Sequence, residues 1–510
     1  MEVLTGKASK IVDNYCINEL KIPSLVLMER AALAVSECVT GICEQNKYNK
    51  IKIICGVGNN GADGLALARI LCDDKTDINK SDISIGIIGN MTKASEEFNI
   101  QYDILQNIGM NIIHIEDKEQ FKDLIADGEL IVDAIFGIGL SRDVSGLFAD
   151  IINEINESKI KAIAIDCPSG LNSDNGRVMG VAIKAYKTVT FGRLKAGLVL
   201  CDGKNCTGEV LVRQVGFNGL AYKHLRKNYK EEVFNAFTRE DLQIIPERNP
   251  VSNKGTYGRI KVIAGSKNMC GAAILSATAA YRCGAGIVEV LTHRDNLPIV
   301  KGRIIEAIVN DYLEAFDLDS HSIVVAGPGL SIDDTANNLI KKVLTSNCNA
   351  VIDADGLNVI SENIELLKLL HNKVIITPHI KEMSRLTEIS CKDIRENIVN
   401  VAKDFSKKYG CITVIKDATT VIADYNGNVT VNLSGNSGMS TGGSGDVLSG
   451  IIGGMLSQKL GIYEAACMGV YLHGLAGDYA KEIKSVYGMM ASDINDAIAQ
   501  ILKFRNNGEV

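Results

Sequence analysis

Short apolar runs alternate with longer helical patterns along the whole chain. Each run has the length of a strand and no polar alternation, which is typical of a parallel sheet covered on both faces. Such runs lie at residues 51–55, 83–88, 130–134, 162–165 and 188–191, and again at 260–264, 287–291, 323–326, 351–353, 374–377 and 412–415. The pattern therefore predicts two successive α/β domains.

The boundary between these domains is expected near residues 220–245. There the apolar runs stop, and the basic segment KHLRKNYK (223–230) precedes a polar stretch with Pro246 and Pro250. A chain of 510 residues also exceeds the roughly 250–300 residues at which single cores stop growing. We predict domains at 1–225 and 226–510.

Composition and charge exclude several classes of protein. Hydrophobic residues make up 46% and charged residues 23% of the chain, which is typical of a packed globular protein. The net charge is -7 and its charges are scattered, so we expect no nucleic-acid partner. The N-terminus has no apolar signal core and no run could span a membrane, so we expect a cytoplasmic protein. The 14 cysteines include no C-x-x-C pair, which predicts reduced, structural thiols.

A glycine-rich loop follows the first strand. Residues 56–64 read GVGNNGADG, and a helical pattern begins at Leu65. Strand, glycine loop and helix in this order form an anion-binding geometry. The loop also matches G-x-G-x-x-G, but the second strand ends in Gly89 and Asn90 rather than the acidic residue of dinucleotide-binding proteins. An ordinary NAD-dependent dehydrogenase is therefore disfavoured.

Other polar residues in the first half also stand at strand ends: Asn59, Asn60 and Asp63 after the first strand, Asp133 late in the third and Asp166 after the fourth. Because the carboxyl ends of parallel strands form one crevice, these side chains should meet there. Their oxygens suit a polar ligand assisted by a hard cation. The alternative is that each serves only as a turn residue.

The densest glycine loop lies in the second half. Residues 435–446 read GNSGMSTGGSGD and lead into a helical pattern at 447–456. Backbone N–H groups at a helix N-terminus can hold phosphates, and Asp446 can take a proton from a hydroxyl under phosphorylation. The alternative is that Asp446 only caps the helix. The motif G-x-x-x-x-G-K-[ST] is absent, which excludes a P-loop enzyme.

Further strand-end loops support a nucleotide site in this half: GPG at 327–329, Asp353 and Asp355, TPH at 377–379, and KDATT at 416–420. The position of Lys416 after an apolar strand favours a phosphate contact. A solvated lysine and a merely structural His379 are the alternatives.

Three motifs of the first half resemble the NAD(P)H-hydrate epimerase family: GVGNNGADG, DAIFGIGLSRD (133–143) and DCPSG (166–170). The resemblance implies a Rossmann-like, three-layer domain, with potassium held by Asn60, Asp133 and Ser169. It implies substrate contacts at Asn59, Asn60, Gly61, Ala62, Asp63, Gly137, Ile138, Gly139, Leu140, Ser141, Arg142, Asp143 and Asp166. Ala62 replaces the family's second glycine, which would strain the loop only if that position needs a positive φ.

The second half resembles the ADP-dependent (S)-NAD(P)H-hydrate dehydratase, a ribokinase-like family, through KGTYG (254–258), AGS (264–266), GAA (271–273), GPGL (327–330), TPH, KDATT and GGSGDVLSG (442–450). The resemblance implies hydrate contacts at Ala272, Gly329, His379 and Asp446. It implies adenine-nucleotide contacts at Lys416, Asp417, Ala418, Thr419, Thr420 and Gly445. Ile380-Lys381 and Asp417 depart from the family pattern, which bears on loop shape.

Together the resemblances imply a bifunctional repair enzyme for hydrated NADH and NADPH, with Mg²⁺ and ADP as co-substrate and a homo-oligomeric state. Asp446 would be the base in dehydration, and Asp166 would transfer the proton in epimerisation. Two alternatives remain open from the residues alone. One is a ribokinase-like kinase of a vitamin alcohol with an N-terminal regulatory domain; the other treats the N-terminal half as a binding module without catalysis.

Overall fold

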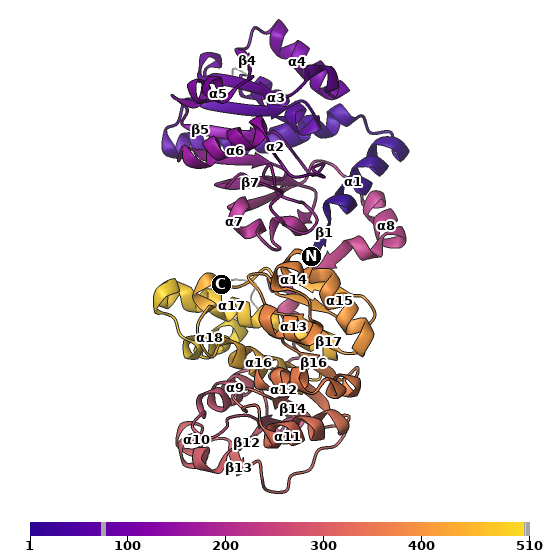
Figure 1. Ribbon diagram of the computed structural model, residues 1–510, viewed down its shortest axis with the longest axis vertical. Helices are drawn as coiled ribbons and strands as arrows, with labels where there is room; N and C mark the ends of the chain where they lie inside the picture. The colour runs from indigo at the N-terminus through magenta and orange to yellow at the C-terminus, as the bar shows by residue number, and fades with distance from the viewer. Residues whose placement is uncertain (73–77, 504, 506–510) are drawn as a thin grey trace. The chain divides into compact units, whose positions relative to one another are not determined.

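The computed structural model describes residues 1–72, 78–503 and 505. The chain divides into two compact units, Glu2–Val233 and Phe234–Val510, called here the N-terminal and the C-terminal unit. Each unit is an α/β assembly with helices packed on a mostly parallel sheet (Figure 1).

The N-terminal unit contains helices α1 (Gly6–Asn14), α2 (Ser24–Asn46), α3 (Asn59–Leu71), α4 (Glu96–Asn107), α5 (Lys118–Ile125), α6 (Leu147–Glu157), α7 (Gly203–Thr207) and α8 (Gly219–Asn228). Its strands are β1 (Glu2–Leu4), β2 (Ile51–Gly56), β3 (Ile83–Ile88), β4 (Ile112–His114), β5 (Leu130–Ala134), β6 (Lys161–Ile165), β7 (Lys187–Phe191), β8 (Leu194–Lys195) and β9 (Glu209–Arg213). All five predicted strands are confirmed, with bounds shifted by at most one residue.

The central sheet of this unit has the order β4-β3-β2-β5-β6-β7-β9, and all of its neighbours are parallel. The order reverses between β2 and β5. In open α/β sheets, ligands bind at such a reversal, outside the carboxyl ends of the strands.

Side chains of successive residues in these strands enter different cores. Ile53 packs in a core with residues of α2, α3 and α4, whereas its neighbour Ile54 packs in a second core with residues of α5 and α6. Because side chains alternate across a strand, a continuous apolar run fills both faces of the sheet. This explains why the strands show no polar alternation.

The C-terminal unit contains strands β10 (Val233–Asn235), β11 (Arg259–Ile263), β12 (Ile287–Thr292), β13 (Ile308–Asp311), β14 (Ile323–Ala326), β15 (Asn349–Ile352), β16 (Val374–Ile376), β17 (Ile412–Ile415), β18 (Val421–Ala423) and β19 (Val429–Val431). Its helices are α9 (Gly271–Arg282), α10 (Leu297–Arg303), α11 (Asp334–Thr345), α12 (Asp355–Glu362), α13 (Ile380–Thr387), α14 (Cys391–Glu396), α15 (Ile398–Tyr409), α16 (Ser444–Ser457), α17 (Ile462–Gly488) and α18 (Ala491–Lys503).

The sheet of this unit runs β13-β12-β11-β14-β15-β16-β17-β18-β19. Its strands are parallel up to β17, and β18 and β19 continue it antiparallel. The six predicted strands are confirmed, although β15 ends at Ile352 and leaves Asp353 in the following loop. The order reverses between β11 and β14, which places a second ligand crevice there.

Both helices at the glycine loops begin earlier than the apolar pattern predicts. Helix α3 starts at Asn59 rather than Leu65, and α16 starts at Ser444 rather than Val447. Glycine-rich first turns carry no apolar stripe, so the periodicity becomes visible only one or two turns later. Ala62 is consequently helical and is not among the residues with positive φ, so the replacement of glycine causes no backbone strain there.

All 14 cysteines lie in the described part of the chain and are free thiols, as predicted. Within the same described residues, no helix is both long and apolar enough to cross a membrane.

The turn from β2 into α3 requires glycine at position 61. A Cβ on Gly61 would lie 1.7 Å from the carbonyl oxygen of Gly56, whereas a Cβ on Gly41 in α2 would meet no atom within 4 Å. We therefore predict that Gly61→Ala lowers the free energy of unfolding by about 1–3 kcal/mol. Gly41→Ala is the matched control and should raise it by up to about 1 kcal/mol. Urea unfolding of both variants tests this; equal effects would contradict it.

Candidate active sites

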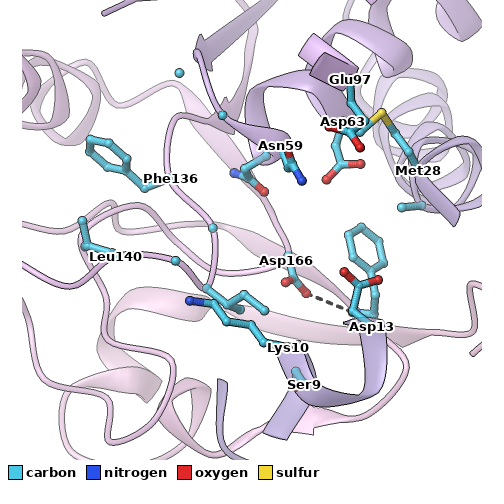
Figure 2. A pocket seen from close by; sticks show the side chains of 18 of the residues that line it. Ser9, Lys10, Asp13, Met28, Asn59, Asp63, Glu97, Phe136, Leu140 and Asp166 are labelled. Atoms are coloured by element: carbon cyan, nitrogen blue, oxygen red, sulfur yellow. Dashed lines mark hydrogen bonds between the residues drawn. The ribbon is translucent and has the colours of Figure 1, made fainter. Parts of the chain in front are cut away.

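A cavity of about 770 Å³ lies at the reversal between β2 and β5. It is lined by the loop after β2, by residues 137–142 after β5 and by Asp166 after β6, together with Lys10 and Asp13 of α1. Figure 2 shows Asp13, Asp63, Glu97 and Asp166 placed around this one cavity. Its volume lies within the range of small-molecule sites.

Asp166 is held in place by donors on one of its two carboxylate oxygens. Oδ1 accepts hydrogen bonds from Lys195 Nζ at 2.5 Å, Thr190 Oγ1 at 3.0 Å and the Phe191 N–H at 3.2 Å. The Lys195 side chain is only 2% exposed, and β8 places it by pairing Lys195 with Leu4 of β1. Within the described residues Oδ2 accepts no hydrogen bond, which leaves it available for proton transfer.

Three more carboxyl groups line the same cavity. Burial, together with the negative charge of Asp166, raises the pKa of Asp63 well above its usual value and also raises the pKa of Asp13. Glu97 adds to both effects and accepts a hydrogen bond from Ser24 Oγ at 2.7 Å. The cavity therefore combines a carboxylate paired with an ammonium and two carboxyl groups, those of Asp13 and Asp63, that retain protons more readily than in water.

The three residues expected to hold potassium lie at one strand edge. Asp133 is fully buried and accepts hydrogen bonds from Ser169 Oγ at 2.5 Å, Ser169 N–H at 2.8 Å and Ile135 N–H at 3.2 Å. Burial raises the pKa of Asp133 to about 6. Among the described residues, the buried amide oxygen and nitrogen of Asn60 have no hydrogen-bond partner. The orphaned amide oxygen after β2 and the carboxylate and hydroxyl at the ends of the neighbouring strands β5 and β6 are donors of the kind that fits a hard cation.

The structure brings most of the other expected epimerase residues to the cavity, but not all. Asn59, Asn60, Asp63 and residues 137–142 line it. Gly61 and Ala62 are buried in the first turns of α3, and Asp143 is exposed and pairs with Arg177 at 3.0 Å. Lys195, Lys10 and Asp13 were not predicted from the sequence. A lysine inside the apolar segment 194–200 was a usable signal for Lys195, whereas nothing in α1 marked the other two.

The second crevice is expected at the carboxyl ends of β11 and β14, the paired parallel strands at which the strand order of the C-terminal unit reverses. Gly329 follows β14 with a φ of +60°, and a Cβ built on it would lie 3.1 Å from Cβ of Ala272 in α9. The Ser266 N–H donates to the Gly329 carbonyl at 2.6 Å, which ties the loops after β11 and β14 together. Two residues expected to contact the hydrate are therefore neighbours.

His379, Lys416 and Gly445 meet at the ends of the next strands. His379 and Lys416 form an isolated parallel bridge, and Lys416 Nζ donates to Asp353 Oδ1 at 2.7 Å. A Cβ on Gly445 would lie 3.4 Å from that Nζ. His379 Nδ1 accepts from the Glu382 N–H at 3.0 Å, and burial lowers the pKa of His379. A neutral imidazole with this acceptor carries its proton on Nε2, which lies 3.5 Å from Glu382 Oε1.

Asp446 is not the cap of its helix. Gly443 is the N-cap of α16, and Asp446 lies in the first turn, where its carbonyl accepts from Ser276 Oγ at 2.8 Å. The interpretation that Asp446 only caps the helix is therefore wrong. Burial, together with the negative charge of Asp353, raises the pKa of Asp446 to about 6. A carboxylate with that pKa is a competent base near neutral pH.

The remaining expected nucleotide contacts follow β17 in sequence, but they do not all face the same way. Asp417 pairs with Arg395 of α14 at 3.3 Å, and Ala418 is exposed. Thr419 is buried, and the Thr420 carbonyl accepts from the Asn432 N–H at 2.9 Å. Lys416 is thus the member of this loop that lies beside Gly445 and Asp446.

The contributions of Asp166 and Lys195 to the free energy of unfolding should be strongly coupled. Lys195→Met leaves a buried carboxylate without its cation, which costs about 3–5 kcal/mol in the free energy of unfolding. The double variant Lys195→Met/Asp166→Asn should lose less than Lys195→Met alone. Lys122→Met removes an exposed ion pair with Glu119 and should cost about 0–1 kcal/mol. Urea unfolding of the wild type, these three variants and the single variant Asp166→Asn measures this; additive effects of Lys195→Met and Asp166→Asn would contradict it.

Two protein families match this chain. Residues 24–197 match the family described as YjeF-related protein N-terminus, and residues 260–500 match NAD(P)H-hydrate dehydratase. Each match falls within one compact unit.

Relatives match over the full length as well. The bifunctional NAD(P)H-hydrate repair enzyme Nnr of Moorella thermoacetica is 34% identical over 524 residues, covering 99% of this chain and 97% of that protein. The NAD(P)H-hydrate epimerase of Oenococcus oeni is 39% identical over 216 residues, covering 42% of this chain and 96% of that protein. Among solved structures, an ADP/ATP-dependent NAD(P)H-hydrate dehydratase from Bacillus subtilis was co-crystallised with ATP and Mg²⁺. It is 28% identical with a TM-score of 0.49, and the match covers 54% of this chain and 99% of that chain. With matches to both families and to a repair enzyme along nearly its whole length, the chain belongs to the family of bifunctional NAD(P)H-hydrate repair enzymes.

Proposed function

We propose that the two units divide the repair of hydrated NADH and NADPH, with epimerisation in the cavity of the N-terminal unit and dehydration at the crevice of the C-terminal unit. The chain is an NAD(P)H-hydrate epimerase and a nucleotide-dependent NAD(P)H-hydrate dehydratase by family. The observation that best supports this assignment is the position of Asp446. It is a base in the first turn of the helix that follows the glycine loop, beside Lys416. The kinase alternative is not favoured, because full-length relatives are repair enzymes.

Dehydration has to remove a poor leaving group. Hydration of reduced nicotinamide leaves a hydroxyl on C6, next to the ring nitrogen. Asp446 takes the hydroxyl proton as the oxygen attacks the terminal phosphorus of magnesium-bound ADP, which releases AMP. The nitrogen lone pair then expels phosphate, and loss of a proton from C5 restores the C5=C6 double bond.

The first turn of α16 supports this transfer. Its early N–H groups, including those of Gly445 and Asp446, have no carbonyl partner one turn back and can face phosphate oxygens. Lys416 adds a positive charge beside them, and neutral His379 is our candidate contact for the hydrate. These fixed donors would stabilise the charge that develops on the transferred phosphoryl group.

Epimerisation supplies the dehydratase with the S form. The C6 centre carries a hydroxyl and a ring nitrogen, so it inverts when the hydroxyl leaves and water returns on the other face. Asp166 is our candidate for the proton transfer, because Lys195 fixes one carboxylate oxygen and the other is unengaged within the described residues.

Asn60, Asp133 and Ser169 would hold potassium, and of these three Asn60 lines the cavity. The orphaned Asn60 amide oxygen is the observation that supports a cation there. Bound potassium would supply a positive charge next to the loop 137–143. We propose no nucleic-acid partner, and a homo-oligomeric state and a cytoplasmic location stay predictions of the sequence.

The test is recovery of reduced-nicotinamide absorbance from hydrated NADH that contains both epimers, with and without ADP and Mg²⁺. The proposal predicts that recovery needs the nucleotide and proceeds for both epimers faster than spontaneous epimerisation. Recovery of one epimer only would remove the epimerase assignment, and a stable phosphate ester as the product would support a kinase.

Two substitutions should separate the activities. Asp446→Asn removes the base and should slow dehydration by about 10²–10⁴-fold while epimerisation continues. Asp166→Asn should slow epimerisation by a comparable factor while the S form is still dehydrated. Each variant is the folding control for the other, because the two residues lie in different units. Epimerisation at the full rate in Asp166→Asn would contradict the assigned role.

A further inference from the structure

Asp353 is a buried charged residue that has no role in the reaction proposed above. Its side chain is 1% exposed, and Oδ1 accepts the hydrogen bond from Lys416 Nζ at 2.7 Å. The Asp353 N–H donates to the Ala326 carbonyl at 3.1 Å, and the Asp353 carbonyl accepts from the Gly356 N–H at 3.0 Å. These backbone hydrogen bonds hold Asp353 in place, and the longer side chain of Lys416 reaches its carboxylate.

The ion pair spans three strand ends. Asp353 follows β15 and Lys416 follows β17, while β16 between them leads into His379. A Cβ on Gly445 would lie 3.4 Å from Lys416 Nζ and 3.7 Å from Asp353 Oδ2. Both charged groups thus lie directly against the residue that precedes Asp446.

Several titratable groups surround Asp446. Asp353, Lys416 and Asp355 act on it most strongly. Glu382 of α13, His379 and His473 of α17 face the ion pair of Lys416 and Asp353. Burial would lower the pKa of Lys416, but the negative charges of Asp353, Glu382 and Asp446 hold it above its usual value. The lysine ammonium therefore has two aspartates within its field, and it is hydrogen-bonded to only one of them.

We propose that Asp353 is a positioning residue of the dehydratase: its carboxylate anchors the Lys416 ammonium beside Gly445 and keeps it from pairing with Asp446. The proposal rests on the proposed function of this crevice. A lysine side chain is long and flexible, so without an anchor it can pair with Asp446 or with Glu382, the other carboxyl groups that act on it. Pairing with Asp446 would neutralise the base, and in either case the phosphoryl group would lose a fixed cation.

Asp353→Asn tests this in the full chain because it keeps the size of the side chain and removes the charge. The proposal predicts that kcat for dehydration at saturating MgADP falls about 10–100-fold, while epimerisation is unchanged. The acid limb of the dehydration rate, set by Asp446, should move to lower pH, because a negative neighbour is lost and the ammonium approaches. Lys416→Met should move that limb to higher pH. Glu365→Gln changes an exposed carboxylate of the same unit and should change neither quantity.

Titration of the Asp446 carboxyl carbon by ¹³C NMR, assigned with Asp446→Asn, gives a readout that needs no turnover. The midpoint should be near 6 in the wild-type protein, lower in Asp353→Asn and higher in Lys416→Met. A wild-type kcat with an unmoved midpoint in Asp353→Asn would overturn the proposal. A reduced kcat with an unmoved midpoint would also overturn it, because Asp353 would then be only structural.

The outcomes separate this proposal from the proposed function. A wild-type protein that does not dehydrate the hydrate overturns the function, and the NMR titration still decides the role of Asp353. If Asp353→Asn loses its fold, judged by circular dichroism, Lys416→Met decides alone: an unmoved Asp446 midpoint overturns the proposal, and an upward shift supports it.

Discussion

Burial of aspartates at the carboxyl ends of parallel strands is the constraint on which both units depend. Parallel strands bring the loops that follow them to one edge, so the polar residues of those loops cluster beside a fully apolar sheet. A carboxylate in that position is costly unless cations or hydrogen-bond donors face it. Lys195 meets Asp166, Lys416 meets Asp353, and Ser169 donates twice to Asp133.

The two clefts use this arrangement differently. In the N-terminal unit the ammonium binds the carboxylate that we assign to proton transfer, and it leaves one oxygen unengaged within the described residues. In the C-terminal unit the ammonium binds a neighbouring aspartate, and Asp446 remains a separate base with a pKa near 6. Proton transfer at a carbinolamine needs one oriented carboxylate, whereas phosphoryl transfer needs a base and a cation side by side.

Much of the fold was predictable from the sequence, because fully buried strands leave uninterrupted apolar runs such as 51–55 and 323–326. The helix starts at Asn59 and Ser444 were predicted too late, because glycine-rich first turns show no apolar stripe. The aspartates at the strand ends were predicted because the apolar runs that mark the strands also mark where each strand ends. Lys195, Lys10 and Asp13 were missed because their roles depend on the packing of α1 and β8 against distant loops. Asp143, which was expected at the substrate, lies at the surface and pairs with Arg177.

The route taken by the hydroxyl oxygen tests the central claim most directly. The hydrate would be prepared in ¹⁸O-labelled water, so that its C6 hydroxyl carries the label. Its S form would then be dehydrated with ADP and Mg²⁺ in unlabelled water by the Asp166→Asn variant, so that epimerisation does not exchange the label with the solvent. Phosphoryl transfer followed by elimination predicts one ¹⁸O atom in each inorganic phosphate, visible as an isotope shift in ³¹P NMR. Label in water and none in phosphate would mean that the hydroxyl leaves without phosphorylation and would contradict the account.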